Sequence, residues 1–286
     1  MATQIRQFQS DASYGSQNYS TSNLFANFNG YESIWLGDTL VAFIAARTSD
    51  ISAAHVVDVM DNCGNSWDQV PGAAVTITAN GQTVMLDVWI AKNVAGCGNA
   101  LPAFILSFAL DETTDALGAA VFDFVGAVNA ASAGGVSSAT PPASLSGPSL
   151  VAGNLSAAFL AMAIANANYG VPPVIPASWS DDTDVANFGH QVCATFGHYL
   201  GSGTQQPAFG IYQNENELAA ITGVAISDGT TVSSGEPFTR DDCEPGDGIT
   251  VRFLRDCFEG QAGDVKKLSA SVARERVVKG DAEFVY

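Results

Sequence analysis

The sequence predicts an all-β protein, an antiparallel jelly-roll-like β-sandwich with a C-terminal β extension. Apolar runs of strand length recur along the chain and are separated by Gly, Pro, Asn and Asp, as is typical of sandwiches and barrels. Asn80 and Gly81 lie between two alternating runs, which is a strong hairpin signal. No Asp, Glu, Lys, Arg or His occurs between Asp123 and Asp181, whereas surface helices usually carry charged pairs.

The expected strands follow one another from the N-terminus. A short strand at residues 5–9 precedes a polar, turn-rich loop at 10–24. Residues 39–46, TLVAFIAA, form a continuous apolar run, which predicts a strand buried on both faces or near the centre of the sandwich. Residues 129–149 predict a linker-like crossing between the two halves of the sandwich. Further strands or hairpins are expected over residues 55–61, 74–91, 103–109, 119–128, 150–152, 156–166, 191–200, 208–212 and 219–227.

The distribution of basic residues divides the chain into two regions. The first part of the sequence contains only Arg6, Arg47 and Lys92, whereas the last part contains the other eight of the 11 basic residues. We therefore expect a jelly-roll-like sandwich over residues 1–229 and an arm or small appended module over 230–286. An exposed β edge in this arm is suited to pairing with a neighbouring subunit, which predicts self-association or contact with other structural subunits.

The net charge of -18 opposes binding to phosphate backbones and to anionic lipid surfaces, so nucleic acid is not an expected partner. The most apolar stretch, residues 149–168, is interrupted by Gly153 and Asn154. It predicts two strands around a tight turn, and membrane insertion is not expected. The opening residues MATQIRQFQSDASYG lack the apolar core of a signal peptide.

Five cysteines leave at least one thiol unpaired within the chain. Cys63 and Cys97 lie in Gly-containing turns, and Cys243 and Cys257 flank an apolar strand candidate. Two disulfides are therefore candidates, Cys63 with Cys97 and Cys243 with Cys257. The alternative is five reduced cysteines, as expected for a protein assembled in a cytosol.

Several motifs in order along the chain resemble a bacterial and phage β-sandwich module. In the first half these are GDTLVAFIA, VVDVMDNCGNSWDQV, VMLDVWIAKNVAGCGNALPAFILSF and AAVFDFVGAV, and in the second PSLVAGNLSAAFLAMA, QVCATFGHYL and ELAAITGVAI. The resemblance covers about residues 5–228 and includes no catalytic motif. It implies the fold, and a setting in phage particles or secreted bacterial proteins. Cys63 within the turn and the scarcity of basic residues depart from the module's pattern.

Oxygen-bearing side chains gather around one turn, and such turns hold Ca²⁺ when backbone carbonyls complete the shell. The candidate calcium ligands are Asp58, Asp61, Asn65 and Asp68. The alternative is an Asx-turn, in which Asp61 and Asn65 bind backbone donors and Gly64 supplies a positive φ. Apart from calcium, no cofactor is expected.

Other clusters suggest weaker alternatives. Asp181, Asp182 and Asp184 predict a second acidic turn, and Glu215 and Glu217 are spaced to share one strand face, as in jelly-roll glycosidases. His190 and His198 have the parity of one strand face, and His55 is separate. Four tryptophans are candidates for a sugar-stacking platform or for core packing, namely Trp35, Trp67, Trp89 and Trp179.

Known motifs for nucleophiles, phosphate binding, zinc and dinucleotides are absent from the sequence, so no catalytic residue is assigned. The function expected is a non-enzymatic structural or display protein at a virion surface or in an extracellular assembly, such as a phage capsid decoration, fibre or tail component. A carbohydrate-binding or adhesion module, with a cell-surface glycan as partner, is the first alternative. A polysaccharide-degrading enzyme is the second.

Overall fold

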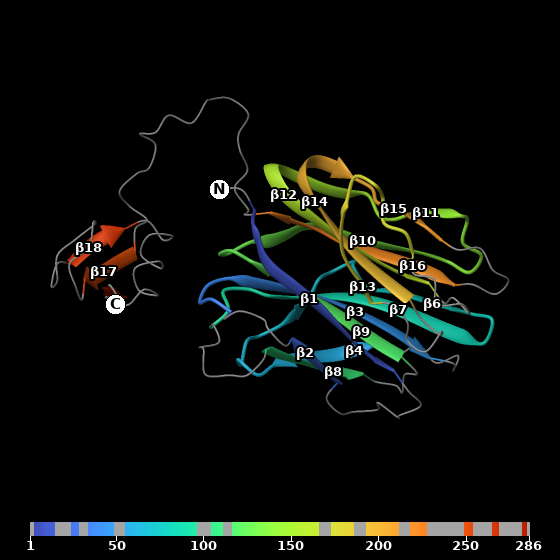
Figure 1. Ribbon diagram of the computed structural model, residues 1–286, viewed down its shortest axis with the longest axis horizontal. Coiled ribbons are helices and arrows are strands. Elements are labelled where there is room, and N and C mark those ends of the chain that lie inside the picture. The colour runs from blue at the N-terminus through green and yellow to red at the C-terminus, as the bar shows by residue number, and fades with distance from the viewer. Residues whose placement is uncertain are drawn as a thin grey trace. The chain divides into compact units, whose positions relative to one another are not determined.

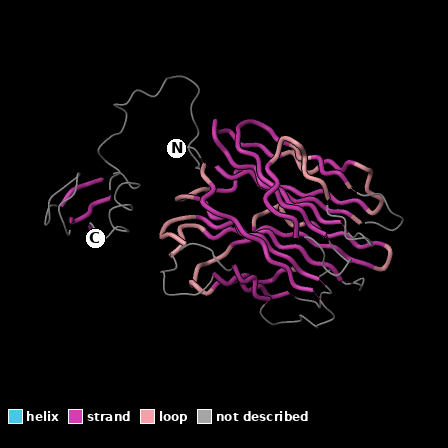
Figure 2. Tube along the Cα trace, viewed as in Figure 1, coloured by secondary structure: helices cyan, strands magenta, loops and turns pink. Residues whose placement is uncertain are grey.

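The computed structural model describes residues 3–14, 24–28, 34–48, 55–95, 104–110, 116–165, 173–185, 193–211, 218–227, 249–253, 265–268 and 282–284. These residues form strands and connecting turns, and no helix occurs among them (Figure 2). The prediction of an all-β protein is therefore confirmed. A search of the same residues for a helix long and apolar enough to cross a membrane found none.

The chain divides into two compact units, Met1–Val232 and Ser233–Tyr286, close to the predicted boundary at residue 229. The second unit contains a three-stranded antiparallel sheet of order β18-β17-β19 (Figure 1). This sheet is the predicted C-terminal β extension. Its strands are β17 (Ile249–Phe253), β18 (Val265–Leu268) and β19 (Ala282–Phe284).

The first half of the larger unit forms one central sheet. Its strand order is β1-β9-β3-β7-β5, β6 also pairs with β7, and the pairs are antiparallel. The predicted hairpin is confirmed, because Asn80 and Gly81 join β6 to β7 with φ values of 55° and 73°. The strands of this first central sheet are β1 (Ile5–Tyr14), β3 (Thr39–Thr48), β5 (Asp68–Gln69), β6 (Val75–Ala79), β7 (Gln82–Ala91) and β9 (Ala116–Phe124).

The second half of the larger unit forms a second central sheet. Its strands pair antiparallel in the order β10-β16-β12-β14-β13. The strands are β10 (Asn129–Ser138), β12 (Leu150–Ala165), β13 (Ser180–Val185), β14 (Cys193–Gln205) and β16 (Ala219–Ser227).

A smaller outer sheet accompanies each central sheet (Figure 1). The first has the order β2-β8-β4. The second pairs β11 with β15, and an isolated bridge joins Val174 to Gly210 of β15. The outer strands are β2 (Leu24–Phe28), β4 (Val56–Asp61), β8 (Phe104–Leu110), β11 (Ser144–Ser146) and β15 (Ala208–Gly210).

The two halves repeat one strand order. When the paired strands of each central sheet are numbered along the chain, with β6 set aside, both sheets have the spatial order 1-5-2-4-3. The outer strands can be numbered in the same way if Val174, which bridges to β15, is counted as a strand of the second half. Their order is then 1-3-2 in both halves. Each of the two facing central sheets is thus built from one half of the larger unit. A jelly-roll path that winds between these two facing sheets is not confirmed.

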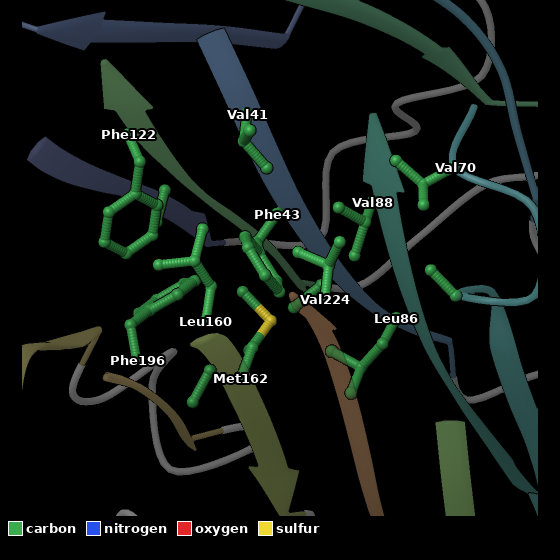
Figure 3. Packing of buried hydrophobic residues seen from close by; sticks show 14 of the residues in the cluster. Val41, Phe43, Val70, Leu86, Val88, Phe122, Leu160, Met162, Phe196 and Val224 are labelled. Atoms are coloured by element: carbon green, nitrogen blue, oxygen red, sulfur yellow. The ribbon is translucent and has the colours of Figure 1, made fainter. Parts of the chain in front are cut away.

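The largest apolar core lies between the two central sheets. Phe43, Phe122 and Val88 of the first sheet point toward Leu160 and Phe196 of the second (Figure 3). Both faces of the central strands are apolar because each sheet is also covered on its outer face, so β3 is buried along its whole length. The prediction of a doubly buried strand at residues 39–46 is therefore confirmed.

Two further cores lie between each central sheet and its outer cover. In the first half, Ala42, Ile44 and Val121 pack with Val59 and Leu106 of the outer sheet. In the second half, the corresponding core contains side chains from the central strands β12 and β16 and from the outer strands β11 and β15. The larger unit is consequently a stack of four β layers with three apolar interfaces.

Four sequence predictions of secondary structure are wrong. The loop expected at 10–24 is wrong at both ends, because β1 extends to Tyr14 and β2 begins at Leu24, and the residues between lie outside the described ranges. The crossing expected at 129–149 contains β10 and β11, whose small side chains fit close strand packing. The two strands expected around Gly153 are one strand, β12, with a register irregularity between Ala152 and Ala157. The acidic turn expected at 181–184 lies in β13.

Candidate functional site

A set of polar and charged side chains, which we call the Arg6 cluster, lies where β1, β3 and β9 meet. Arg6 Nε donates a hydrogen bond to Asp38 Oδ2 at 2.9 Å and lies 3.9 Å from Asp123 Oδ2. Gln7 Nε2 donates to the same Asp123 oxygen at 3.0 Å. Asp38 is 1% exposed and Asp123 is 0% exposed. The Arg6 guanidinium is thus shared by two buried carboxylates.

Local contacts fix Asp38 at the start of β3. Its Oδ1 accepts a hydrogen bond from Gly126 N at 2.7 Å, and Gly126 adopts a φ of 76° that glycine tolerates. Thr39 Oγ1 donates to the Gly126 carbonyl at 3.0 Å. The Arg6 guanidinium also lies 4.6 Å from the centroid of the Trp35 ring. The start of β1, the start of β3 and the end of β9 are therefore tied together.

The environment of Asp123 disfavours its charged form. Burial raises the pKa of Asp123 to about 7, and the nearby charge of Asp38 acts in the same direction. The hydrogen bond from Gln7 and the positive charge of Arg6 lower this pKa, but by less than burial raises it. Asp123 Oδ1 is buried and has no hydrogen-bond partner. Asp123 therefore exchanges a proton near neutral pH.

Proton binding and release are the chemistry that this geometry supports. A carboxylate with no exposed surface does not reach a substrate, and Arg6 already occupies the space beside both acids. The Arg6 cluster is a buried charged junction between three strands.

A second buried carboxylate, Asp87, lies on β7 and is 2% exposed. Gln69 Nε2 and Trp89 Nε1 donate to its Oδ2 at 2.9 and 3.0 Å, and Val88 N donates to its Oδ1 at 2.8 Å. Burial raises the pKa of Asp87, and these hydrogen bonds lower it by less than burial raises it. Both oxygens are used within the fold, so Asp87 has a structural role.

The turn proposed as a calcium site is organised by Asp61. Its Oδ1 accepts hydrogen bonds from the backbone nitrogens of Cys63 and Asn65 at 2.9 and 3.1 Å. Its Oδ2 accepts from Asn65 Nδ2 and Trp67 Nε1, each at 2.9 Å. Gly64 follows with a φ of 75°. The alternative prediction, an Asx-turn closed by a glycine, is confirmed.

The remaining calcium candidates, Asp58, Asn65 and Asp68, have different surroundings. Asp58 and Asp68 are exposed, and Asn65 Oδ1 accepts a hydrogen bond from Ala95 N at 2.8 Å. Within the described residues, no group of three or more His, Cys, Asp or Glu side chains is placed to hold a metal ion. The calcium prediction gains no support from this turn.

The tryptophans are core residues more than surface residues. Trp67, Trp89 and Trp179 are each at most 8% exposed, and Trp35 lies against Arg6. These four side chains do not form an open stacking platform. Among the histidines, His198 packs near Phe8 with ring centroids 6.5 Å apart.

Of the predicted disulfide cysteines and the other candidate site residues, only some lie within the described ranges. Cys63 is disulfide-bonded, which contradicts the alternative of five reduced cysteines. Its predicted partner Cys97 lies outside the described residues, as do the second predicted pair, Cys243 and Cys257, and the candidates His190, Glu215 and Glu217. Both pairings therefore stay predictions.

Sequence reasoning missed the Arg6 cluster. One signal was present, because Asp123 interrupts the apolar strand sequence AAVFDFV and Asp38 precedes the apolar run of β3. An isolated carboxylate in a strand that is buried on both faces requires a partner, and sequence did not show that Arg6 supplies it.

Comparison with protein-family models, with curated proteins and with solved structures found no match. The resemblance to the bacterial and phage sandwich module therefore stays an expectation.

Proposed function

We propose that this protein is a non-enzymatic structural or display subunit of a virus particle or of an extracellular assembly. The observation that carries the proposal is the doubled sandwich, in which two halves of one strand order pack face to face. Within each half the chain alternates between a central and an outer sheet, as jelly rolls do. Jelly rolls build many viral capsid and lectin domains.

In the described part of the chain, the interior is better suited to packing than to catalysis. Three apolar cores occupy the interfaces between the layers, and the buried acids Asp38, Asp87 and Asp123 bind partners within the fold. Since one fold serves many functions, the test must measure assembly directly.

The joining element in this proposal is the second unit, Ser233–Tyr286. Its three-stranded sheet has β18 and β19 at its edges, and edge strands pair readily with other chains. The unit contains eight of the 11 basic residues and 11 of the 29 acidic ones, so it is close to neutral, whereas the larger unit is strongly acidic. Two second units therefore repel each other less than two larger units do, which favours contacts between chains through the second unit.

Light scattering of the full-length chain and of a chain truncated after Val232 tests the proposal. We expect a closed or filamentous assembly for the full-length protein and monomers for the truncated one. A thermal unfolding transition in the truncated chain serves as the control for its folding. Monomers in both samples would refute the assembly role and favour the alternative of a carbohydrate-binding module, for which a glycan array is the next measurement.

A further inference from the structure

Strand β1 is an edge strand of the first central sheet, and within the described sheet it pairs with β9. Its side chains Arg6 and Gln7 make the contacts to Asp38 and Asp123 described above. The Arg6 cluster therefore joins an edge strand to the interior through ionisable groups. We propose that the Arg6 cluster is a proton-operated clamp, which holds β1 on the sheet when Asp123 is protonated and loosens β1 when Asp123 is ionised.

The orphaned oxygen of Asp123 is the geometric basis of the clamp. Ionised Asp123 places a second negative charge beside Asp38, while Oδ1 has no donor to stabilise it. A buried charge without full hydrogen bonding is costly. If β1 moves away, water reaches Asp123, and the ionised carboxylate becomes hydrated. Ionisation and the opening of β1 therefore favour each other.

The other charged groups around Asp123 do not reverse this coupling. From β1 it faces Arg6 and Gln7, and from β3 it faces Asp38. The outer strands β2 and β8 contain no titratable residue, and β4 contributes Asp58, which is exposed, and Asp61, which binds its own turn. From the second central sheet, His198 of β14 packs against Phe8 of β1, and β13, which contacts β1, carries Asp181, Asp182 and Asp184. The Asp123→Asn variant described below separates the response of Asp123 from that of these groups. Among the described residues, Arg6 is the positive group that lowers the pKa of Asp123, and it already bonds Asp38.

The sign of the effect follows from proton linkage. The closed strand holds the Asp123 proton up to a pKa of about 7, whereas a hydrated Asp titrates near 4. Between these values the closed state binds more protons than the open state, so raising the pH favours opening. The opening constant is expected to rise about tenfold per pH unit up to neutrality, and to level off above it.

Amide hydrogen exchange followed by NMR tests the clamp in the full-length protein. After correction for the intrinsic exchange rate, protection of residues 5–8 in β1 should fall about 100-fold between pH 5 and pH 8. Strand β10 is the internal reference, because it is the corresponding edge strand of the second half and carries no titratable residue. Its protection should change much less.

Asp123→Asn removes the titrating proton while keeping the size of the side chain, and should abolish the pH dependence of β1. Asp87→Asn is the matched control, since Asp87 is similarly buried but lies on β7, which β9 and β3 separate from β1. In this variant β1 should respond to pH as in the unaltered protein. Equal pH responses of β1 and β10 in the unaltered protein would overturn the proposal, whether or not the variants fold. An unchanged β1 response in folded Asp123→Asn would also overturn it.

Discussion

The two halves of the larger unit share a strand order but differ in what they bury. The buried charged residues of the described structure, Asp38, Arg47, Asp87 and Asp123, all lie in the first half. The buried polar residues of the second half are hydroxyl side chains, Thr195, Thr222 and Ser227. One topology is thus compatible with an ionisable interior and with a neutral one. The shared strand order is thus kept while the buried polar side chains differ, and we expect only the first half to respond to pH through its interior.

The interface between the halves is the first place to test this comparison. Phe43 lies at its centre, with ring centroids 6.0 Å from Phe122 and 6.5 Å from Phe196. Phe43→Ala should lower the free energy of unfolding by about 3–5 kcal/mol, because it removes buried area and leaves a cavity. Chemical denaturation measures the loss.

Phe159→Ala in the core of the second half is the matched variant for Phe43→Ala. It should cost a similar amount, and both variants should retain a single unfolding transition. Two separate transitions would contradict the view that the halves are one cooperative unit.

The second largest effect is expected in the pH dependence of global stability, which should depend on the buried acid of the first half. Because the pKa of Asp123 is raised in the folded state, its contribution to stability is greatest below pH 4 and is lost as the pH rises to about 7. Between pH 5 and pH 8 the unaltered protein should therefore lose about 3 kcal/mol of unfolding free energy that the Asp123→Asn variant does not lose. Thermal or urea unfolding at both pH values checks this. If the stability of the two proteins depends equally on pH, Asp123 is not the group that causes the pH dependence.

Close approach of the halves is tested at Gly135 of β10. A Cβ atom there would lie 1.7 Å from Val75 Cγ2 of β6, in the other half. Gly135→Ala should therefore cost about 1–3 kcal/mol through overpacking. Val75→Ala in the same chain should recover part of the loss. No recovery in the double variant would show that the strain arises elsewhere.

The smallest expected effect concerns one hydrogen bond between the halves. Thr222 Oγ1 donates to the Ala73 carbonyl at 2.6 Å, and Thr195 Oγ1 makes a bond of the same length to the Pro173 carbonyl within the second half. Thr222→Val and Thr195→Val should each cost about 1–2 kcal/mol, since a buried carbonyl loses a donor. Denaturant unfolding of both variants measures this. A neutral Thr222→Val would mean that this bond does not contribute to joining the halves.

The apolar pattern was sufficient to predict the fold class, the Asn80–Gly81 hairpin and the doubly buried strand that became β3, because each depends on local sequence. The strand β10 was missed because its Ala, Ser and Gly residues lack the bulky pattern of a strand, and its pairing with β16 is what defines it. The Asx-turn at Asp61 was predictable because its partners are close in sequence.

The Arg6 cluster was not predictable in this way. Arg6 and Asp123 are brought together by the pairing of β1 with β9, strands from opposite ends of the first half. Burial, which sets the behaviour of Asp123, likewise results from three layers of distant segments. Long-range pairing therefore determines both the site and its chemistry.

The most direct test of the difference between the halves is the titration of Asp123 itself, followed by the carboxyl ¹³C chemical shift in the full-length protein. Our account predicts a midpoint near pH 7, because the residue is buried beside Asp38 and lacks a donor at Oδ1. A midpoint near pH 4, the value of a hydrated Asp, would contradict an ionisable interior in the first half.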